Sequence, residues 1–277
     1  MRRAEVNIFG LFCCEVNLLV ANEGAGTILR YDPAIGAFIG VFATGLNGPG
    51  PLTVGPDNNV YEGSGGNVLK FNGQTGASLG TFATGISSTG GLAFGPNGNL
   101  FTSSGVDSNI KQFNGTTGVF INNFASSAAF VNGAGPLCFY GGNLLVSQTF
   151  GTGGGASWGN AILKFDQTTG NFLGNFASDA NLNGPSGMWQ GPDGNLYVAN
   201  YVGNNVLKYS PAGAFLGGAD TSANGSQAPR FVTFSSAGSN PVPSTPAPSS
   251  LTLMMLAIAA ISGWMAWRRF ANRAAVR

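Results

Sequence analysis

The fold is decided by the stretch Gly191-Pro-Asp-Gly-Asn-Leu-Tyr-Val198, because variants of it recur along the chain. The Asn of this stretch is followed by a short apolar segment. The same pattern, Asn and then an apolar segment, occurs five times, beginning at Asn17, Asn59, Asn99, Asn143 and Asn195. Consecutive Asn positions are 42, 40, 44 and 52 residues apart. A period near 40 residues that is made of short strands is typical of small sheets arranged in a closed array.

Each copy contains the signals of four strands. In the second copy, Leu52–Val54 leads through the turn Gly55–Asn58 into the apolar stretch. Pro presets the backbone at one turn position and Asx tolerates the next. Val68–Phe71 then alternates with period two, and Ser78–Phe82 ends the copy after a second turn. The sequence therefore predicts one small four-stranded sheet per copy.

The two ends of the repeated region complement each other. No convincing strand precedes the first apolar stretch, whereas an orphan strand signal, Arg230–Phe234, follows the last copy. Pairing the orphan with the first copy would close the ring and leave no unpaired edge at the seam. We therefore predict an all-β fold, a β-propeller of five four-stranded blades over residues 17–236, closed by a C-terminal strand that completes the first blade. A sixth blade would need strands within Arg2–Cys14.

The repeat resembles those of the NHL-type and gluconolactonase-like propeller families, whose signature residues 191–198 reproduce in full. The gluconolactonase-like enzymes hold a divalent cation with carboxylates at the central channel. The carboxylates at the ends of the apolar stretches here, Glu23, Glu62 and Asp107, fall at different offsets in the repeat and do not describe one site. We expect no metal, no cofactor and no enzymatic activity; a metal-dependent lactonase and a protein–protein scaffold are the alternatives.

Composition removes several classes of function. Only 8% of residues are charged, the net charge is +1, and the chain contains no His. There is no basic face for nucleic acid, and the commonest general base is missing. Cys138 lies in an apolar stretch and is expected to be a small core residue. The repeated turns account for Asp32, Asp57, Asp166 and Asp193, and cations recur in the third strand as Arg30, Lys70, Lys164 and Lys208, where we expect them to be solvated or to protect blade edges.

Binding is expected on the side of the molecule where the connections vary between copies. Polar residues end the apolar stretch in all five copies: Asn22, Ser64, Ser104, Gln148 and Asn200. They are candidates to ring the central channel and hydrogen-bond a ligand; the alternative is that they satisfy backbone groups at the strand ends. The Gly-rich insertion Thr149–Asn160 adds Trp158, and it is either a ligand-contacting loop or a tolerated surface insertion.

The C-terminal part has the composition of a membrane-anchoring segment. Residues 237–250 are rich in Pro and Ser, residues 251–267 carry no charge, and residues 268–277 contain four Arg. Seventeen residues span about 25 Å as a helix, close to the thickness of a bilayer core. The sequence therefore predicts an extended linker, a transmembrane helix and a basic cytoplasmic tail, with the propeller on the opposite side of the membrane.

This tail resembles the PEP-CTERM sorting signal of exported bacterial proteins. The matching residues are Pro246, Ala247, Pro248, Ser249, Arg268 and Arg269, with Ala247 where the family has Glu. The resemblance implies an exosortase-like sorting enzyme as a partner, and extracellular polysaccharide or other envelope proteins as further partners. The propeller is then anchored on the periplasmic or extracellular side, or released after the tail is processed. An ordinary membrane anchor is the alternative.

Residues 1–16 fit an export signal only in part. Arg2 and Arg3 would be its positive region, but Ile8–Cys14 is a short apolar run with no cleavage site after it. This favours a true start upstream of Met1, with these residues as a remnant of a signal peptide. The alternative is that the C-terminal helix alone directs membrane insertion.

Overall fold

The computed structural model describes residues 18–22, 25–31, 38–104, 106–126, 130, 133–148, 159–191 and 193–220. All of these belong to one compact unit, Met1–Val242. The second unit, Pro243–Arg277, lies outside the described residues, as do the predicted transmembrane helix and the sorting residues. Within the described ranges, no helix has the length and apolar character needed to cross a membrane.

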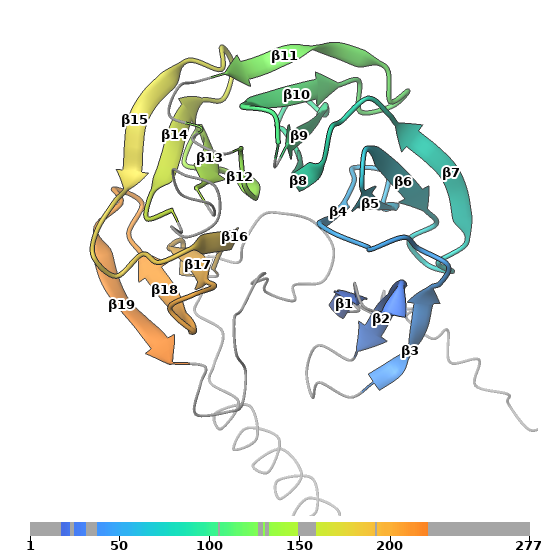
Figure 1. The fold of residues 1–277 in the computed structure, drawn as a ribbon, viewed down its shortest axis with the longest axis horizontal. Coiled ribbons are helices and arrows are strands. Elements are labelled where there is room, and N and C mark those ends of the chain that lie inside the picture. The colour runs from blue at the N-terminus through green and yellow to red at the C-terminus, as the bar shows by residue number, and fades with distance from the viewer. Residues whose placement is uncertain are drawn as a thin grey trace, which may run out of the picture. The chain divides into compact units, whose positions relative to one another are not determined.

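The described residues form five antiparallel sheets, and together these make a five-bladed β-propeller (Figure 1). The first blade contains β1 (Leu18–Asn22), β2 (Thr27–Tyr31) and β3 (Phe38–Ala43). The second contains β4 (Leu52–Val54), β5 (Val60–Ser64), β6 (Asn67–Phe71) and β7 (Ser78–Ala83). The third contains β8 (Thr89–Phe94), β9 (Leu100–Ser104), β10 (Asn109–Phe113) and β11 (Phe120–Ser126). The fourth contains β12 (Leu137–Tyr140), β13 (Asn143–Ser147), β14 (Ile162–Asp166) and β15 (Phe172–Ala177). The fifth contains β16 (Pro185–Gln190), β17 (Leu196–Asn200), β18 (Asn205–Tyr209) and β19 (Phe215–Asp220).

The predicted all-β propeller with five blades is confirmed. The order of strands within each sheet follows the chain, with the first strand of a blade innermost and the last outermost (Figure 1). In the first blade the structure describes three strands, β1 to β3. The closing strand expected over 230–234 and the segment 1–16 fall outside the described residues, so that closure stays a prediction.

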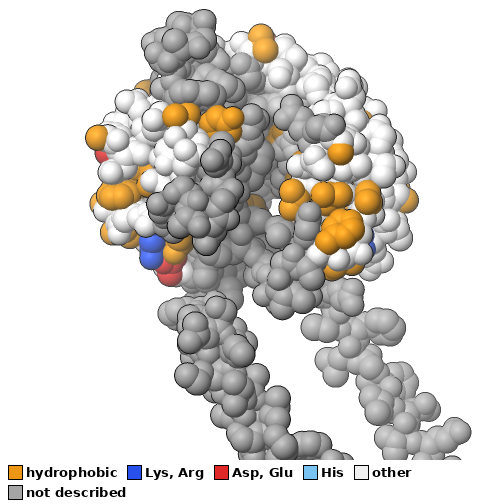
Figure 2. Space-filling model, turned by 60° about the horizontal axis from the view of Figure 1, so that its bottom comes forward, with side chains coloured by type: hydrophobic (Ala, Val, Ile, Leu, Met, Phe, Trp, Pro, Cys, Tyr) orange, Lys and Arg blue, Asp and Glu red, His pale blue; other side chains and the backbone are white. Residues whose placement is uncertain are grey.

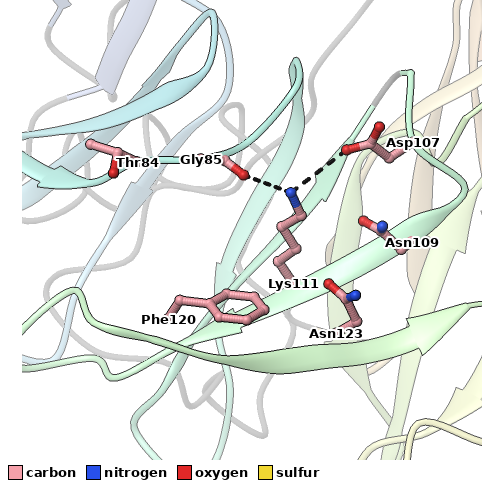
Figure 3. Close-up of a pocket in the computed structure, with 7 residues that line it drawn as sticks. All are labelled: Thr84, Gly85, Asp107, Asn109, Lys111, Phe120 and Asn123. Atoms are coloured by element: carbon pink, nitrogen blue, oxygen red, sulfur yellow. Dashed lines mark hydrogen bonds and ion pairs between the residues drawn. The ribbon is translucent and has the colours of Figure 1, made fainter.

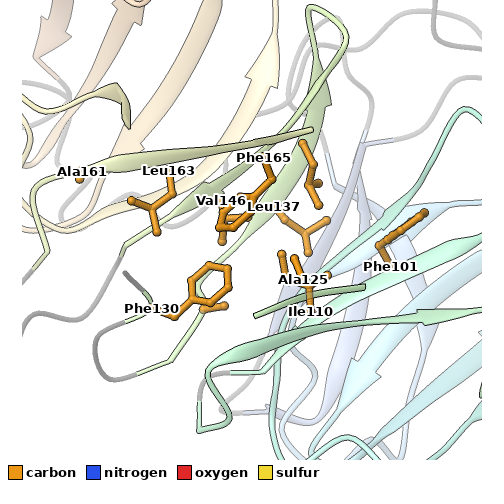
Figure 4. Close-up of a cluster of buried hydrophobic side chains, with 11 residues drawn as sticks. Phe101, Ile110, Ala125, Phe130, Leu137, Val146, Ala161, Leu163 and Phe165 are labelled. Carbon is orange, nitrogen blue, oxygen red and sulfur yellow. The ribbon is translucent and has the colours of Figure 1, made fainter. Parts of the chain in front are cut away.

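In the fourth and fifth blades the second strand, β13 or β17, is largely apolar on both faces because it lies between neighbouring blades. In β13, Leu144 and Val146 belong to a buried cluster that includes Phe101 of the third blade, and Figure 4 shows Val146 within this cluster. Leu145, which points to the other face of the same strand, packs with Leu196 of the fifth blade. Burying one such side chain contributes about 1.5–3 kcal/mol. Equivalent clusters join the first blade to the second and the second to the third.

In the repeated turns, the acidic side chains accept hydrogen bonds from backbone N–H groups of the same turn. In the turn between the first and second strands, Asp57 Oδ1 accepts the Asn59 N–H at 3.2 Å. In the turn between the third and fourth strands, Asp166 Oδ1 accepts the N–H groups of Thr168 and Thr169 at 2.9 and 2.7 Å. Asp193 accepts the Asn195 N–H in the same way. The interpretation of these three acids as turn formers is confirmed, and Asp32 lies outside the described residues.

The outermost strands expose apolar side chains in every blade. Figure 2 shows exposed apolar side chains on one face of the molecule. The exposed residues are Phe38 and Ile39, Leu79, Phe120 and Ile121, Phe172 and Leu173, and Phe215 and Leu216. Each outermost strand pairs with its neighbour through at least one register shift. Such bulges twist an edge strand and discourage it from pairing with another chain. These outermost strands are therefore protected from aggregation by their bulges rather than by charged side chains.

Candidate functional site

The five polar residues predicted to ring the channel all lie where the second strand of a blade ends. Asn22, Ser64, Ser104 and Asn200 are the last residues of β1, β5, β9 and β17, and Gln148 follows β13 directly. The register pairs Ser64 with Asn67 and Asn200 with Asn205, so these ends lie next to the connection to the third strand. They lie at the strand ends where the sequence predicted them, and both the ring around the channel and a role in binding stay predictions.

Three of these five side chains hold connections in place. Ser104 is 1% exposed, and its hydroxyl accepts the N–H groups of Val106 and Asp107 at 3.2 and 2.9 Å. Asn200 is also 1% exposed; its Oδ1 accepts the Asn183 N–H at 2.7 Å and its Nδ2 donates to the Asn181 carbonyl at 2.9 Å. Ser64 donates to the Asn47 carbonyl at 3.2 Å. These contacts favour the structural alternative for Ser64, Ser104 and Asn200.

The Gly-rich insertion is not part of the described structure. Trp158 and residues 149–158 lie outside it, so the ligand-contacting loop stays a prediction. Asn160, at the end of the insertion, is exposed and leads into β14. No site is built on this segment.

Two of the four third-strand cations, Lys70 and Lys208, form ion pairs with the acidic turns of their own blades. Lys70 Nζ lies 2.8 Å from Asp57 Oδ2, and the Tyr61 hydroxyl donates to the same carboxylate at 3.0 Å. Lys208 and Asp193 repeat the ion pair at 2.6 Å. Burial acts to raise the pKa of Asp57, but the hydrogen bonds from Lys70, Asn59 and Tyr61 outweigh it and hold the pKa well below its usual range. These two cations are therefore bound within their blades rather than simply solvated.

The third blade departs from this pattern. In the other four blades, the residue opposite the third position of the apolar stretch is a Leu: Leu29, Leu69, Leu163 and Leu207. In the third blade that residue is Lys111, paired with Thr102. The next position, which is Arg or Lys elsewhere, is Gln112. The cation has moved by one residue, and alternation along a strand turns it to the other face, toward the second blade.

The displaced lysine borders a pocket of about 490 Å³ between the second and third blades (Figure 3). Lys111 Nζ donates to the Gly85 carbonyl at 2.6 Å and lies 3.6 Å from Asp107 Oδ2. The Ser87 hydroxyl donates to the same carboxylate oxygen at 2.6 Å. The Gly85 and Asp107 end of the pocket thus lies beside the connections that vary between copies, whereas Phe120 follows the uniform turn between the third and fourth strands.

The rest of the lining combines an aromatic ring with neutral polar groups. Phe120 of β11 is 50% exposed, and its ring packs edge-on against Phe113 with centroids 5.6 Å apart. The side chains of Thr84, Asn109 and Asn123 complete the lining (Figure 3). The buried Asn109 Oδ1 has no hydrogen-bond partner within the part of the chain that the structure describes. A buried acceptor without a partner costs about 1–3 kcal/mol of folding free energy. A ligand that donates a hydrogen bond to Asn109 Oδ1 would therefore stabilise the folded protein.

Sequence reasoning missed this site although a signal was present. Cations were recognised in the third strand of four copies, and the third copy was the exception. Aligning Lys111 with Leu69, Leu163 and Leu207 marks the position as altered. The alignment does not indicate that Lys111 binds Gly85 of the second blade, because Gly85 lies in a connection of irregular backbone.

The structure gives Cys138 no nucleophilic character. It is half-buried against the cluster between the fourth and fifth blades, and burial raises the pKa of its thiol to about 12. Thiol groups react as thiolates, so the raised pKa favours the protonated, less reactive form of Cys138 at neutral pH. Across the ranges that the structure describes, Cys, Asp and Glu side chains nowhere gather in threes as a metal site would require.

Comparisons with known proteins bear on the fold. No protein-family model and no curated protein matches the sequence. Among solved structures, the chain is similar to a streptogramin B lyase, with a TM-score of 0.54 and 15% identity over 75% of this chain. The chain spans 66% of the length of that lyase chain. In all, 1066 solved chains match, so the architecture is common and does not by itself indicate an activity. The similarity supports a β-propeller fold.

Proposed function

We propose that the protein is a non-catalytic binding module of the bacterial cell envelope, exported and then sorted or anchored through its C-terminal tail. The observation that carries the binding role is the departure of the third blade from the repeat. Lys111 replaces a core Leu and lies beside a pocket lined by polar residues and an exposed aromatic ring. A regular scaffold that changes its chemistry at one place is the usual arrangement of a binding site on a rigid fold.

The proposal that the protein is not an enzyme rests on the fact that its described acids and its Cys138 thiol are held in structural contacts or kept protonated. The chain contains no His, the described turn acids bind backbone N–H groups or lysines, and the Cys138 thiol is protonated at neutral pH. The solved neighbour is named a lyase, and at 15% identity that name describes the neighbour. Incubating the full chain with a panel of lactones and with streptogramin B, in the presence of Mg²⁺ or Ca²⁺, should give no turnover. Turnover above the uncatalysed rate would contradict the proposal.

Export and anchoring rest on the tail residues and are tested in cells. The full chain with an epitope near the end of the propeller region is expressed in a bacterium that carries a sorting enzyme of the exosortase type. Protease should digest the propeller when added to intact cells if it lies at the surface, or to spheroplasts if it lies in the periplasm, and mass spectrometry should find a new C-terminus near residues 246–249. A propeller protected from protease in both intact cells and spheroplasts would refute export.

A protein–protein scaffold is the second candidate, and the exposed apolar residues of the outermost strands favour it. Exposed apolar patches often mark protein interfaces. Replacing Leu79, Leu173 and Leu216 with Thr should abolish capture of envelope proteins by the full chain if it is a scaffold. Capture that instead depends on Lys111 would assign binding to the pocket.

A further inference from the structure

We propose that the pocket between the second and third blades binds a sugar unit of an uncharged carbohydrate. The inference rests on the proposed binding function and deepens it by naming the class of ligand. It is drawn from four features of the pocket: an aromatic platform, mixed hydrogen-bonding groups, a balanced charge and a size suited to a small ligand.

The aromatic platform is Phe120. Half of its surface is exposed, while contact with Phe113 fixes the ring in an edge-on arrangement. The face of an aromatic ring carries partial negative charge and attracts polarised C–H groups, which one face of a sugar ring presents. Phe172 and Phe215 occupy the same position in other blades and are 43% and 41% exposed, so the platform alone does not define the site.

The polar groups around the platform suit hydroxyl groups. A hydroxyl both donates and accepts hydrogen bonds, so it needs a lining with both kinds of group. Asn109 and Asn123 supply amide donors and acceptors, and Thr84 supplies a hydroxyl. A lysine ammonium has three N–H donors, and one of them is used by the Gly85 carbonyl, while Asp107 lies at ion-pair distance. The ammonium therefore keeps donor capacity for a ligand hydroxyl. An Asn amide also rotates about its last torsion, so a ligand donor can draw the unpartnered Asn109 oxygen into a bond.

The charge of the pocket favours a neutral ligand. Lys111 and Asp107 form an ion pair at 3.6 Å and are the charged residues in the lining. An anionic ligand would meet the Asp107 carboxylate and a cationic ligand would meet Lys111. The volume of about 490 Å³ falls within the range of about 300–1,000 Å³ that is usual for small-ligand pockets.

The lysine is better explained by ligand chemistry than by packing. At the same position Leu163 and Leu207 are 3% and 2% exposed and belong to the clusters between blades. A Lys at such a place gives up that apolar contact, and its ammonium must be held by a carbonyl and a carboxylate. A scaffold that needed only stability would keep Leu there, as four of the five copies do.

The test is binding of defined oligosaccharides to the full chain. Calorimetric titration uses cello-, malto- and manno-oligosaccharides as uncharged probes and an oligogalacturonate as the anionic probe. At least one uncharged probe should bind, and Phe120→Ala and Lys111→Leu should each weaken that binding tenfold or more. Phe172→Ala is the matched control and should bind like the original protein. Thermal unfolding of each variant checks that it is folded; Lys111→Leu is expected to be, because Leu occupies this position in the other blades.

The outcomes separate this inference from the proposed function. Binding of the oligogalacturonate alone, absence of binding to all uncharged probes, or equal affinity of Lys111→Leu and the original protein would overturn the inference. If the full chain still captures envelope material in a manner independent of Lys111 and Phe120, the binding function stands and the carbohydrate site fails. If it captures nothing, both fail.

Discussion

At the scale of single residues, Glu62 is an acid placed in the core. It is fully buried on β5, on the strand face that also carries Val60, which packs against the first blade. Its Oε1 accepts the Gly50 N–H at 3.0 Å, and its Oε2 has no partner among the described residues. Burial raises the pKa of Glu62, since the charged form loses its hydration. The fourth and fifth blades have Val146 and Val198 at the same position.

Glu62 is expected to make stability depend on pH. Because its pKa is raised in the folded state, the folded protein holds the proton more tightly than the unfolded chain does. Its contribution is complete below the ordinary value of 4.5 and is lost as pH rises through the folded pKa. Denaturant unfolding should show stability falling as pH rises above about 4.5, and Glu62→Gln should flatten that slope. An unchanged slope in the variant would show that Glu62 is not the group responsible.

Gly118 shows how closely the blades approach one another. Its φ is +72°, and a Cβ at this position would collide with the backbone carbonyl of Phe82 in the second blade. Gly98, in the same blade, has a φ of +76° and open space around it. Gly98→Ala should therefore cost about 1–2 kcal/mol of unfolding free energy, from backbone strain alone. Gly118→Ala should cost about 1–3 kcal/mol more, because the neighbouring blade must shift. Equal losses in the two variants would refute the close approach.

At the scale of structural elements, ion pairs fasten the third strand of a blade to its first turn. Asp193 and Lys208 are 2.6 Å apart and partly exposed. Burial works to raise the pKa of Asp193, but hydrogen bonds from Lys208, Asn195 and Tyr197 hold it well below the usual range. A depressed folded pKa gives stability that is present above the ordinary value of 3.8 and is lost as pH falls below it.

Asp193→Asn should therefore lower the unfolding free energy at pH 7 by up to about 1 kcal/mol, since exposed ion pairs contribute little. It should also reduce the loss of stability below pH 3.8. Asp166→Asn is the control, because an amide oxygen can accept the same backbone N–H groups and the described contacts of Asp166 include no ion pair. Denaturant unfolding at pH 3 and pH 7 measures both. A loss at Asp166→Asn as large as at Asp193→Asn would assign the effect to the turn.

Elements that depend on local signals could be predicted from the sequence. The turn Gly95–Gly98 and the alternation in Val68–Phe71 are local, and the strands lie where these signals place them. The pocket depends on contacts between blades, which local signals do not predict. No residue near Lys111 in the sequence indicates that it binds the Gly85 carbonyl. The alternative that strand-end residues bind backbone groups describes Ser104, whose partners are two and three residues away, but the sequence did not indicate the distant Asn183 as a partner of Asn200.

At the scale of the whole molecule, closure of the ring is the main structural prediction. β1 pairs with β2 in a blade with three described strands, and we expect residues 230–234 to pair with its other edge. A chain that ends at residue 236 should be as stable as one that ends at residue 250. A chain that ends at residue 220 should unfold at lower denaturant concentration and aggregate, because an open strand edge pairs with other chains. Equal stability of the chains ending at 220 and 236 would show that the tail does not close the ring.

The central claim is that the altered third blade, rather than the row of polar strand ends, is the binding site. Hydrogen–deuterium exchange of the full chain, with and without a saturating uncharged oligosaccharide, tests this most directly. We expect slower exchange in residues 84–87 and 106–123, which supply the pocket, and unchanged exchange around residues 143–148 and 196–202. Slower exchange at the strand ends of the fourth and fifth blades, with none near Lys111, would contradict it.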